Sequence, residues 1–151
     1  MTQLTGLSGK RVLVTAGASG IGLYIAASFA MAGAKVCVCD NDSTAVLELK
    51  DEHAELQACV TDVSQPDQVE DLFHEVTSRL GGLDILVNNA GIGGRVGRLE
   101  KVPESEWVKT IEVNLLGAYY CCRHAIPLLD MAAGGSIVNL SSSAGLYGTP
   151  N

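Results

Sequence analysis

A glycine-rich stretch near the start of the chain carries the most specific chemical signal in the sequence. It reads TAGASGIG from Thr15 to Gly22 and directly follows an apolar run. Gly17, Gly20 and Gly22 allow the backbone to turn tightly and approach a pyrophosphate, and a helix that begins there offers free N–H groups and a partial positive charge. Glycines also gather in structural turns, but a position between a strand and a helix is the context that this motif requires. The stretch therefore predicts a phosphate-binding loop.

An acidic residue follows this loop at the end of the next apolar run. The carboxylate of Asp40 could accept hydrogen bonds from both hydroxyls of an adenosine ribose, although an Asp that only caps a turn would look the same. A 2′-phosphate at about 4 Å would be repelled by roughly 1–4 kcal/mol. Ser19 and Asn41 stand where a basic residue could offset that repulsion. The sequence therefore favours NAD over NADP as the cofactor.

Both motifs need strands whose ends lie together, and the sequence supplies a matching pattern. Short apolar runs rich in β-branched residues alternate with helical periodicity, which is typical of β-α-β units around a parallel sheet. Ligands of such sheets bind beyond the carboxyl ends of the strands, where the motifs lie. We therefore predict an α/β fold with a doubly wound, Rossmann-type parallel sheet. The predicted strands are Arg11–Thr15, Lys35–Asp40, Gln57–Val60, Leu83–Asn88 and Ser136–Leu140.

Three segments between the strands have helical periodicity. Ile21, Ile25 and Phe29 recur every fourth residue and predict one apolar stripe on a helix closed by Gly33. A second helix is predicted from near Ser64 and Pro66 to Gly81 and Gly82, and a third from near Pro103 to about Leu129, its last turns disturbed by Pro127. The apolar positions of the second helix are Val69, Leu72, Phe73, Val76 and Leu80.

Composition and charge exclude several classes of partner. The chain has 151 residues and a net charge of −7, and its ten basic residues are scattered from Lys10 to Arg123, so that no basic stripe could bind nucleic acid. Its longest nearly apolar stretch, Leu23–Ala34, is shorter than the ~20 residues of a membrane span. The N-terminus lacks the basic and apolar regions of a signal peptide. We therefore expect a cytoplasmic protein that binds neither nucleic acid nor membrane.

The cysteines and histidines show no pattern of a disulfide framework or a metal site. The five cysteines form no CxxC pair, and an odd number leaves at least one unpaired. We expect reduced, mostly buried thiols. His53, His74 and His124 lie in separate segments without ligand spacing, so no metal site is predicted.

Taken together, the motifs resemble those of the classical short-chain dehydrogenase/reductase family over essentially the whole chain. Six segments occur in the family's order and at its spacing. They are TAGASGIG at 15–22, CD at 39–40, TDV at 61–63, NNAG at 88–91, VNLLG at 113–117 and IVNLSSSAG at 137–145.

The resemblance implies roles for particular residues. Asp62 and Val63 would contact the adenine, and Asn89, Ala90 and Gly91 would line the ribose side of the cofactor. Asn114 would hold a water chain for proton relay, and Ser142 would hydrogen-bond the substrate oxygen. An Asn used only for packing and a Ser used only in a turn are the alternatives. The complete predicted cofactor set is Gly17, Ser19, Gly20, Ile21, Asp40, Asp62, Val63, Asn89, Ala90 and Gly91.

The chain departs from the family pattern in two places. Ala16 stands where the family usually has glycine, which is acceptable if its φ is negative. The family's catalytic tyrosine and lysine, expected beyond Ser142, are absent before Asn151. We therefore expect residues 1–151 to be one NAD-binding domain incomplete at its C-terminus, with five of seven strands, inactive alone and left with an open apolar edge at Ser136–Leu140.

For the whole protein the resemblance implies NAD-dependent interconversion of a secondary alcohol and a ketone by hydride transfer, in a homo-oligomer, a dimer or tetramer. The alternative is a non-catalytic dinucleotide-binding module or an inactive fragment. The substrate would be a small alcohol or ketone of undetermined identity. Arg95 and Arg98, in the loop after the fourth predicted strand, could pair with an anionic substrate, but arginines in such loops are more often simply solvated.

Overall fold

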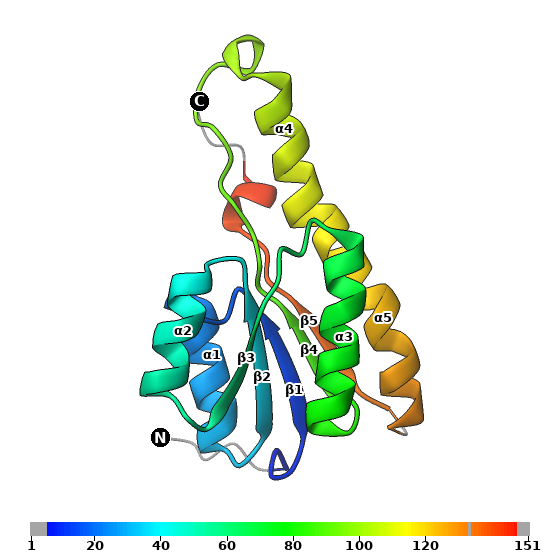
Figure 1. Ribbon diagram of the computed structural model, residues 1–151. Coiled ribbons are helices and arrows are strands. Elements are labelled where there is room, and N and C mark those ends of the chain that lie inside the picture. The colour runs from blue at the N-terminus through cyan, green and yellow to red at the C-terminus, as the bar shows by residue number, and fades with distance from the viewer. Residues whose placement is uncertain (1–5, 133, 148–151) are drawn as a thin grey trace.

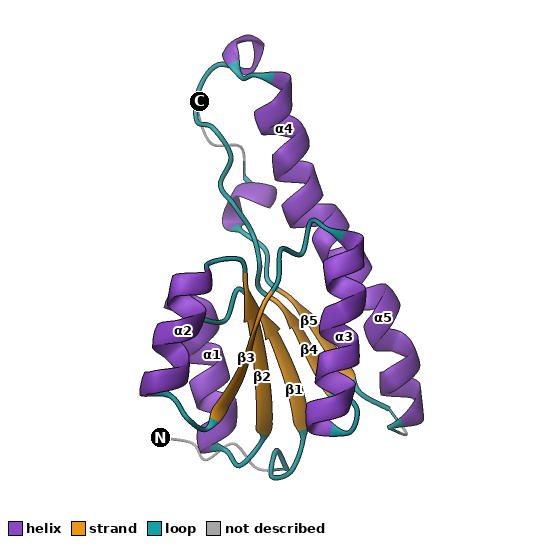
Figure 2. Ribbon diagram, in the orientation of Figure 1, coloured by secondary structure: helices purple, strands orange, loops and turns teal. Residues whose placement is uncertain are grey.

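The protein forms a five-stranded parallel sheet with helices on both faces, and this confirms the predicted fold class (Figures 1 and 2). The computed structural model describes residues 6–132 and 134–147, so both ends of the predicted domain lie outside the described residues. The strand order is β3-β2-β1-β4-β5. The strands are β1 (Arg11–Thr15), β2 (Lys35–Asp40), β3 (Leu56–Val60), β4 (Ile85–Asn88) and β5 (Ser136–Asn139).

Alternation along the central strands divides the core into two layers. Leu13, Cys37 and Leu86 face α3 (Pro66–Leu80) and α5 (Gly117–Met131), whereas Val14 and Val38 face α1 (Gly20–Met31) and α2 (Ser43–Glu52). Because helices cover both faces, β1 and β2 are buried over nearly their whole length. Figure 1 shows the two helix pairs on opposite sides of the sheet.

The helix α1 confirms the predicted helix between the first two strands, but only part of its predicted apolar stripe reaches the core. The residues that the helix buries are Gly22 and Ala26, while the side chain of Ile21 is 70% exposed. The face of α1 that packs on the sheet needs small residues, because a Cβ on Gly22 would collide with the carbonyl oxygen of Ala16. Ile25 and Phe29 are half-buried at the margin of the core. On its outer side the helix presents an apolar surface cavity of about 550 Å³, lined by Gly20, Ile21, Tyr24, Ile25, Ser28 and Phe29.

The helix α2 was missed by the sequence analysis. It begins after Asp42, whose carboxylate accepts hydrogen bonds from the backbone N–H groups of Thr44 (2.9 Å) and Ala45 (3.1 Å). This is a standard N-cap, and it is followed by Val46 and Leu49, which α2 buries. The short repeat of only two buried positions was too weak to predict the helix.

The third predicted helix is continuous but irregular at a different place from the one expected. It consists of α4 (Glu104–Ile111), a π-helical turn η2 (Glu112–Leu116) and α5. Pro127 lies inside α5, which continues to Met131, so the prediction that Pro127 disturbs the last turns was wrong. The irregular turn contains Asn114, and π-turns within helices occur frequently at functional sites.

The strand β5 forms one edge of the described sheet. It pairs with β4 in parallel register, with Leu86 beside Ile137 and Val87 beside Val138. Ile137 packs against the core, whereas Val138 is 46% exposed and Leu140 is 38% exposed. In the described residues this edge therefore presents apolar side chains to solvent.

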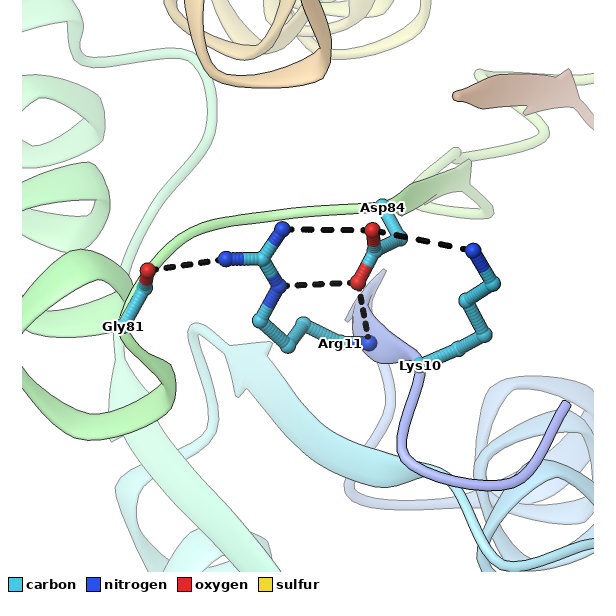
Figure 3. Close-up of polar contacts among 4 residues, drawn as sticks. All are labelled: Lys10, Arg11, Gly81 and Asp84. Carbon is cyan, nitrogen blue, oxygen red and sulfur yellow. Dashed lines mark hydrogen bonds and ion pairs between the residues drawn. The ribbon is translucent and has the colours of Figure 1, made fainter. Parts of the chain in front are cut away.

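A charged cluster ties the amino ends of the central strands together (Figure 3). The guanidinium of Arg11 donates to both carboxylate oxygens of Asp84, at 2.8 and 3.2 Å, and to the carbonyl oxygen of Gly81 at 2.8 Å. The backbone N–H of Arg11 also donates to Asp84 at 2.8 Å, and Lys10 lies 3.9 Å away. The hydrogen bonds from Arg11 lower the pKa of Asp84 below its ordinary value, against a smaller effect of burial.

We predict that Asp84→Asn lowers the free energy of unfolding at pH 7 by about 2 kcal/mol, because Arg11 loses the charged partner of a mostly buried pair. Since the pKa of Asp84 is lowered by folding, its contribution is present above about pH 4 and is lost as the pH falls through the lower folded value. Urea unfolding at pH 7 and pH 3 measures both effects. The difference between the two proteins should shrink at pH 3.

Asp51→Asn is the control, because Asp51 is exposed on α2 and its substitution should change stability by no more than about 0.5 kcal/mol. Equal losses from both substitutions would contradict the role given to Asp84.

Candidate functional site

A cleft of about 160 Å³ opens at the carboxyl ends of the strands. It brings together five residues of the predicted cofactor set, Asp40, Asp62, Val63, Ala90 and Gly91. Since a whole drug-sized ligand occupies roughly 300–1,000 Å³, a cleft of this size would hold one part of a larger ligand. The other residues that line it are Ala16, Asn41, Thr61, Ile92, Lys109 and Val113.

The glycine loop is shaped by close backbone approach. A Cβ on Gly17 would lie 2.7 Å from the Cβ of Val38, and Gly20 has a φ of 53°. Ser19 is the N-cap residue of α1 and makes no side-chain capping bond. The first N–H groups of a helix have no partner within it, so those of Gly20 and Ile21 are available to an anion. This geometry fits the phosphate-binding role predicted for the loop.

Ala16 differs from what the sequence analysis expected. Its φ is +49°, the left-handed region, and not the negative value that would suit an alanine. A non-glycine residue there costs about 1–2 kcal/mol. The neighbouring contacts hold it in place, because its carbonyl oxygen accepts a hydrogen bond from the side chain of Asn89 at 3.0 Å.

The buried hydroxyl of Thr15 joins the carboxyl ends of β1 and β4. Its Oγ1 accepts hydrogen bonds from the backbone N–H groups of Asn89 (3.0 Å) and Ala90 (2.9 Å). In return, Nδ2 of Asn89 donates to the carbonyl oxygens of Thr15 and Ala16, both at 3.0 Å. The side-chain amide of Asn89 thus fixes the first two residues of the glycine-rich segment. No role was predicted for the side chain of Thr15, although it begins the TAGASGIG segment.

Asp40 holds the glycine loop as well as lining the cleft. Its Oδ2 accepts a hydrogen bond from the backbone N–H of Ala18, and its Oδ1 from that of Asp42, both at 3.2 Å. A carboxylate oxygen can accept more than one hydrogen bond, so these contacts leave capacity for ribose hydroxyls. The two interpretations of Asp40, a turn residue and a ribose ligand, are therefore compatible.

Asp62 and Val63 form the wall of the cleft that follows β3. One oxygen of Asp62, Oδ1, accepts from the backbone N–H of Ser64 at 2.9 Å and from its hydroxyl at 2.7 Å. The side chain of Val63 is buried against Gly117, where an added Cβ would lie 2.8 Å from Cγ2 of Val63. Local hydrogen bonds and a glycine contact therefore fix the position of this wall.

Asn114 binds the loop that follows β4. Its Oδ1 accepts from the backbone N–H of Ile92, and its Nδ2 donates to the carbonyl oxygen of the same residue, both at 2.8 Å. Oδ1 would also lie 3.4 Å from a Cβ on Gly91. The side chain of Asn114 therefore positions the segment that lines the cleft.

Ser142 follows β5 and begins the short 3-10 helix η3 (Ser143–Gly145). Its Oγ accepts a hydrogen bond from the backbone N–H of Ala144 at 3.2 Å, so its hydroxyl hydrogen is still able to donate to a ligand. In Figure 1 the red helix η3 lies beyond the carboxyl end of the sheet, on the side from which α4 extends.

Seven predicted site residues do not line the cleft: Gly17, Ser19, Gly20, Ile21, Asn89, Asn114 and Ser142. Lys109, by contrast, lines it and was not predicted. No sequence pattern marks Lys109, because it precedes the VNLLG segment on a helix that only the tertiary fold brings to the strand ends.

The loop after β4 forms a second cleft of about 160 Å³ with α4. Arg95, Glu106 and Trp107 are among the residues that line it. Arg98 is not among them, and its Nε lies 2.8 Å from a carboxylate oxygen of Glu100. Of the two arginines considered for an anionic substrate, Arg98 is thus already paired.

The described residues contain neither a membrane-spanning helix nor a cluster of metal-binding side chains. No helix among residues 6–132 and 134–147 has the length and apolar character needed to cross a membrane. Within the same residues, no three His, Cys, Asp or Glu side chains gather in a way that could hold a metal ion.

The family model for short chain dehydrogenases matches residues 10–151, and the chain belongs to this family. It is 37% identical over 148 residues to a 3beta-hydroxysteroid dehydrogenase of Mediterraneibacter gnavus, and 36% identical over 148 residues to the 3-oxoacyl-(acyl-carrier-protein) reductase FabG of Thermotoga maritima. It is also 37% identical over 148 residues to an L-fucose dehydrogenase of Mus musculus. These alignments cover 94%, 95% and 98% of this chain.

The fold matches a solved structure closely. The crystal structure of levodione reductase superposes with a TM-score of 0.89 at 31% sequence identity, over 95% of this chain and 58% of that one. The chain spans 52%, 60% and 54% of the three relatives named above. These relatives are oxidoreductases by name, and the family uses nicotinamide dinucleotide cofactors.

We predict that Ala16→Gly raises the free energy of unfolding by about 0.5–1 kcal/mol. Glycine removes the left-handed strain but adds conformational entropy to the unfolded chain, and the first effect is the larger. Urea unfolding measures the change. Ala32→Gly is the matched control, because Ala32 has a φ of −82° and glycine there should lower stability. A loss of stability from Ala16→Gly would show that the left-handed conformation is not strained.

Proposed function

We propose that the whole protein is an NAD-dependent oxidoreductase that interconverts a secondary alcohol and a ketone. The observation that carries the proposal is the position of Asp40, which lines the cleft while holding the glycine loop at the N-terminus of α1. A carboxylate and a row of free N–H groups side by side suit a ribose and a pyrophosphate of one dinucleotide. Membership of the family supports the reaction class.

The residues present fit a nicotinamide dinucleotide. Gly17 and Gly22 leave no room for side chains, as a loop that cradles a pyrophosphate requires. Ser19, Gly20 and Ile21 would meet the pyrophosphate, Asp40 the adenosine ribose, and Asp62 and Val63 the adenine. Ala90 and Gly91 would lie along the cofactor, with Asn89 supporting the loop. When bound, the cofactor accepts or supplies the hydride.

The charges of the cleft support NAD over NADP. Asp40 and Asp62 contribute two negative charges to its lining and Lys109 one positive charge, so the lining is net negative. A 2′-phosphate beside Asp40 would meet like charge, and the hydrogen bonds to Ala18 and Asp42 hold that carboxylate in place.

We predict that the whole protein binds NADH at least about tenfold more tightly than NADPH, which corresponds to about 1.4 kcal/mol of repulsion from Asp40. Asp40→Asn should make the two dissociation constants more similar, because it weakens the binding of NADH and removes the charge repulsion that opposes the binding of NADPH. Fluorescence titration with both cofactors measures it. Asp42→Asn is the control, since Asp42 caps α2 and is not among the residues of the cleft. Tighter binding of NADPH by the unaltered protein would overturn the cofactor assignment.

The chain contributes two polar side chains to the proposed chemistry. Ser142 would donate its hydroxyl hydrogen to the substrate oxygen and stabilise negative charge that develops there. Asn114 would hold the loop at Ile92 and support proton exchange with solvent. The tyrosine and lysine that the resemblance implies for the proton transfer are not among residues 1–151. We propose that these residues are one NAD-binding domain that requires the rest of the protein for activity.

We predict that Ser142→Ala in the whole protein lowers kcat by about 10² or more and leaves the Kd for NADH nearly unchanged. A hydrogen-bond donor to the reacting oxygen stabilises the transition state, whereas the binding of NADH does not require the Ser142 hydroxyl. Steady-state rates with a panel of secondary alcohols, together with NADH titration, measure both quantities. Ser141→Ala and Ser143→Ala are the neighbouring controls. Equal losses from either control would show that Ser142 is the wrong serine.

The alternative function, a dinucleotide-binding module without catalysis, predicts a different pattern. Such a protein would bind NADH normally and show no turnover with any alcohol in the panel, with or without Ser142. Steady-state rates measured together with NADH titration therefore distinguish an oxidoreductase from a non-catalytic binding module.

We also propose that the whole protein is a cytoplasmic homo-oligomer. Exposed apolar side chains recur along α4, η2 and α5, and exposed apolar surface often marks an interface. They are Val108, Ile111, Leu115, Tyr119 and Ile126. Sedimentation of the whole protein as a monomer would contradict self-association, and cell fractionation tests the location.

A further inference from the structure

Two cysteines that the proposed function does not use face each other between β2 and β3. The sulfur atoms of Cys37 and Cys59 lie 4.0 Å apart, within hydrogen-bonding distance for thiols. The strands are neighbours in the sheet, as Figure 2 shows, and their register places Cys37 beside Gln57 and Cys39 beside Cys59. Cys37 and Cys59 therefore meet diagonally on one face of the sheet.

The two thiols differ in their access to solvent. Cys37 is fully buried, whereas Cys59 is half-buried near the edge of the sheet, since β3 is the outermost strand on that side. A small reagent could therefore reach the sulfur of Cys59 but not that of Cys37. This is the arrangement of an attacking thiol with a protected partner behind it.

The surroundings of Cys59 favour its thiolate. The pKa of Cys59 is lowered to about 7, first because the Cys37 thiol donates a hydrogen bond to its sulfur, and also because of the positive charges of Arg79 and Lys50. Partial burial and the carboxylate of Glu75 act in the opposite direction. Donation of that hydrogen bond raises the pKa of Cys37, so the proton stays on the buried sulfur.

The other cysteines are differently placed. Cys39 and Cys121 are both buried, and burial raises their pKa values. Cys122 is half-buried, and its sulfur accepts a hydrogen bond from Nδ2 of Asn88 at 3.3 Å. Among the described residues, Cys59 is the only half-buried cysteine whose sulfur lies within 4.0 Å of another thiol, that of the buried Cys37.

We propose that Cys59 and Cys37 form a peroxide-sensitive dithiol that closes to a disulfide between β2 and β3. The Cys59 thiolate attacks one oxygen of hydrogen peroxide and breaks the O–O bond. The product is a sulfenic acid, and the second oxygen leaves as hydroxide, which takes up a proton to become water. The Cys37 sulfur then attacks the sulfenic sulfur, and its proton leaves with the hydroxyl group as a second water. The two sulfurs lose two electrons in total, and the peroxide gains them.

Closure requires the sulfurs to approach from 4.0 Å to about 2.05 Å. Diagonal neighbours on adjacent strands usually have Cα atoms about 7–8 Å apart, whereas a disulfide usually needs about 4.4–6.8 Å. Closure therefore also requires a local shift of the edge strand β3 toward Cys37. The link would join two strands whose carboxyl ends carry Asp40 and Asp62. Cys59 is one residue before the end of β3 and pairs with Cys39, which directly precedes Asp40, so the dithiol lies close to the proposed adenosine site although neither cysteine lines the cleft.

The experiment is to treat the whole, fully reduced protein with hydrogen peroxide at pH 7.5, block the remaining thiols, and map the linked peptides by mass spectrometry. We expect a peptide pair joined through Cys37 and Cys59, within one molecule, that disappears after reduction. The same treatment in denaturant should give no preference for this pair. A native sample whose first link joins any other cysteines, or in which Cys59 is oxidised to sulfinic acid without a link, would overturn the proposal.

Single variants test the order of the steps. Cys37→Ser should leave Cys59 as a sulfenic acid that dimedone traps, and Cys59→Ser should leave Cys37 reduced. Cys122→Ser is the matched control, because Cys122 is also a half-buried thiol, and it should form the Cys37–Cys59 link at the rate of the unaltered protein. Dimedone trapping at Cys122 in preference to Cys59 would contradict the assignment. The mapping of the unaltered protein decides the proposal even if a variant fails to fold.

Discussion

The hydroxyl of Thr15 is the contact on which the candidate site depends. It accepts hydrogen bonds from two backbone N–H groups in the segment after β4, while the side-chain amide of Asn89 donates two hydrogen bonds to the carbonyl oxygens of Thr15 and Ala16. The carboxyl ends of the two central strands are thus joined at a buried point. Because Ala16 lies inside this exchange, its backbone takes the left-handed conformation that turns the chain into the glycine loop. Gly22 can then lie against the Ala16 carbonyl, and α1 begins where its free N–H groups face the cleft.

The charge of the cleft follows from three separate segments that meet above these strand ends. Asp40 ends β2, Asp62 follows β3, and Lys109 comes from α4. The carboxylate of Asp62 is oriented by the nearby backbone N–H of Ser64, whereas that of Asp40 accepts hydrogen bonds both from nearby Asp42 and from Ala18 in the glycine loop. Lys109 reaches the cleft from α4, which is distant in sequence from both carboxylates and meets the strand ends only in the folded protein. The π-turn at Asn114, fastened to Ile92 through both amide atoms, holds that helix to the loop.

Structural features were predictable where one segment carries its own signal, and they were not where packing against a second segment decides them. The strands were predicted to within two residues, since their apolar runs are bounded by turns. The helix α1 was predicted, and Ile25 and Phe29 of its stripe pack at the margin of the core. Its two fully buried residues, Gly22 and Ala26, were not identified, because close packing against the sheet selects small side chains that give no periodic signal. The helix α2 was missed because its cap at Asp42 is clear but its buried face has only two residues. The irregularity of the long helix was predicted at Pro127 because proline is a local helix-breaking signal. The turn at Asn114 could not be predicted in this way, because Asn114 bonds to Ile92 in a different segment.

The sequence by itself determined the α/β class and the succession of strands along the chain, and it predicted which residues could meet a dinucleotide. Those features depend on periodicity and on glycine and carboxylate positions, which are local. Only the tertiary structure decided the left-handed backbone of Ala16, the place of Lys109 in the cleft and the meeting of Cys37 with Cys59. In each case the deciding contact joins segments from different strands or helices: Asn89 with Ala16, α4 with the strand ends, and β2 with β3. Such contacts exist only when the sheet has formed, because strand register and helix packing bring together atoms that are distant along the chain.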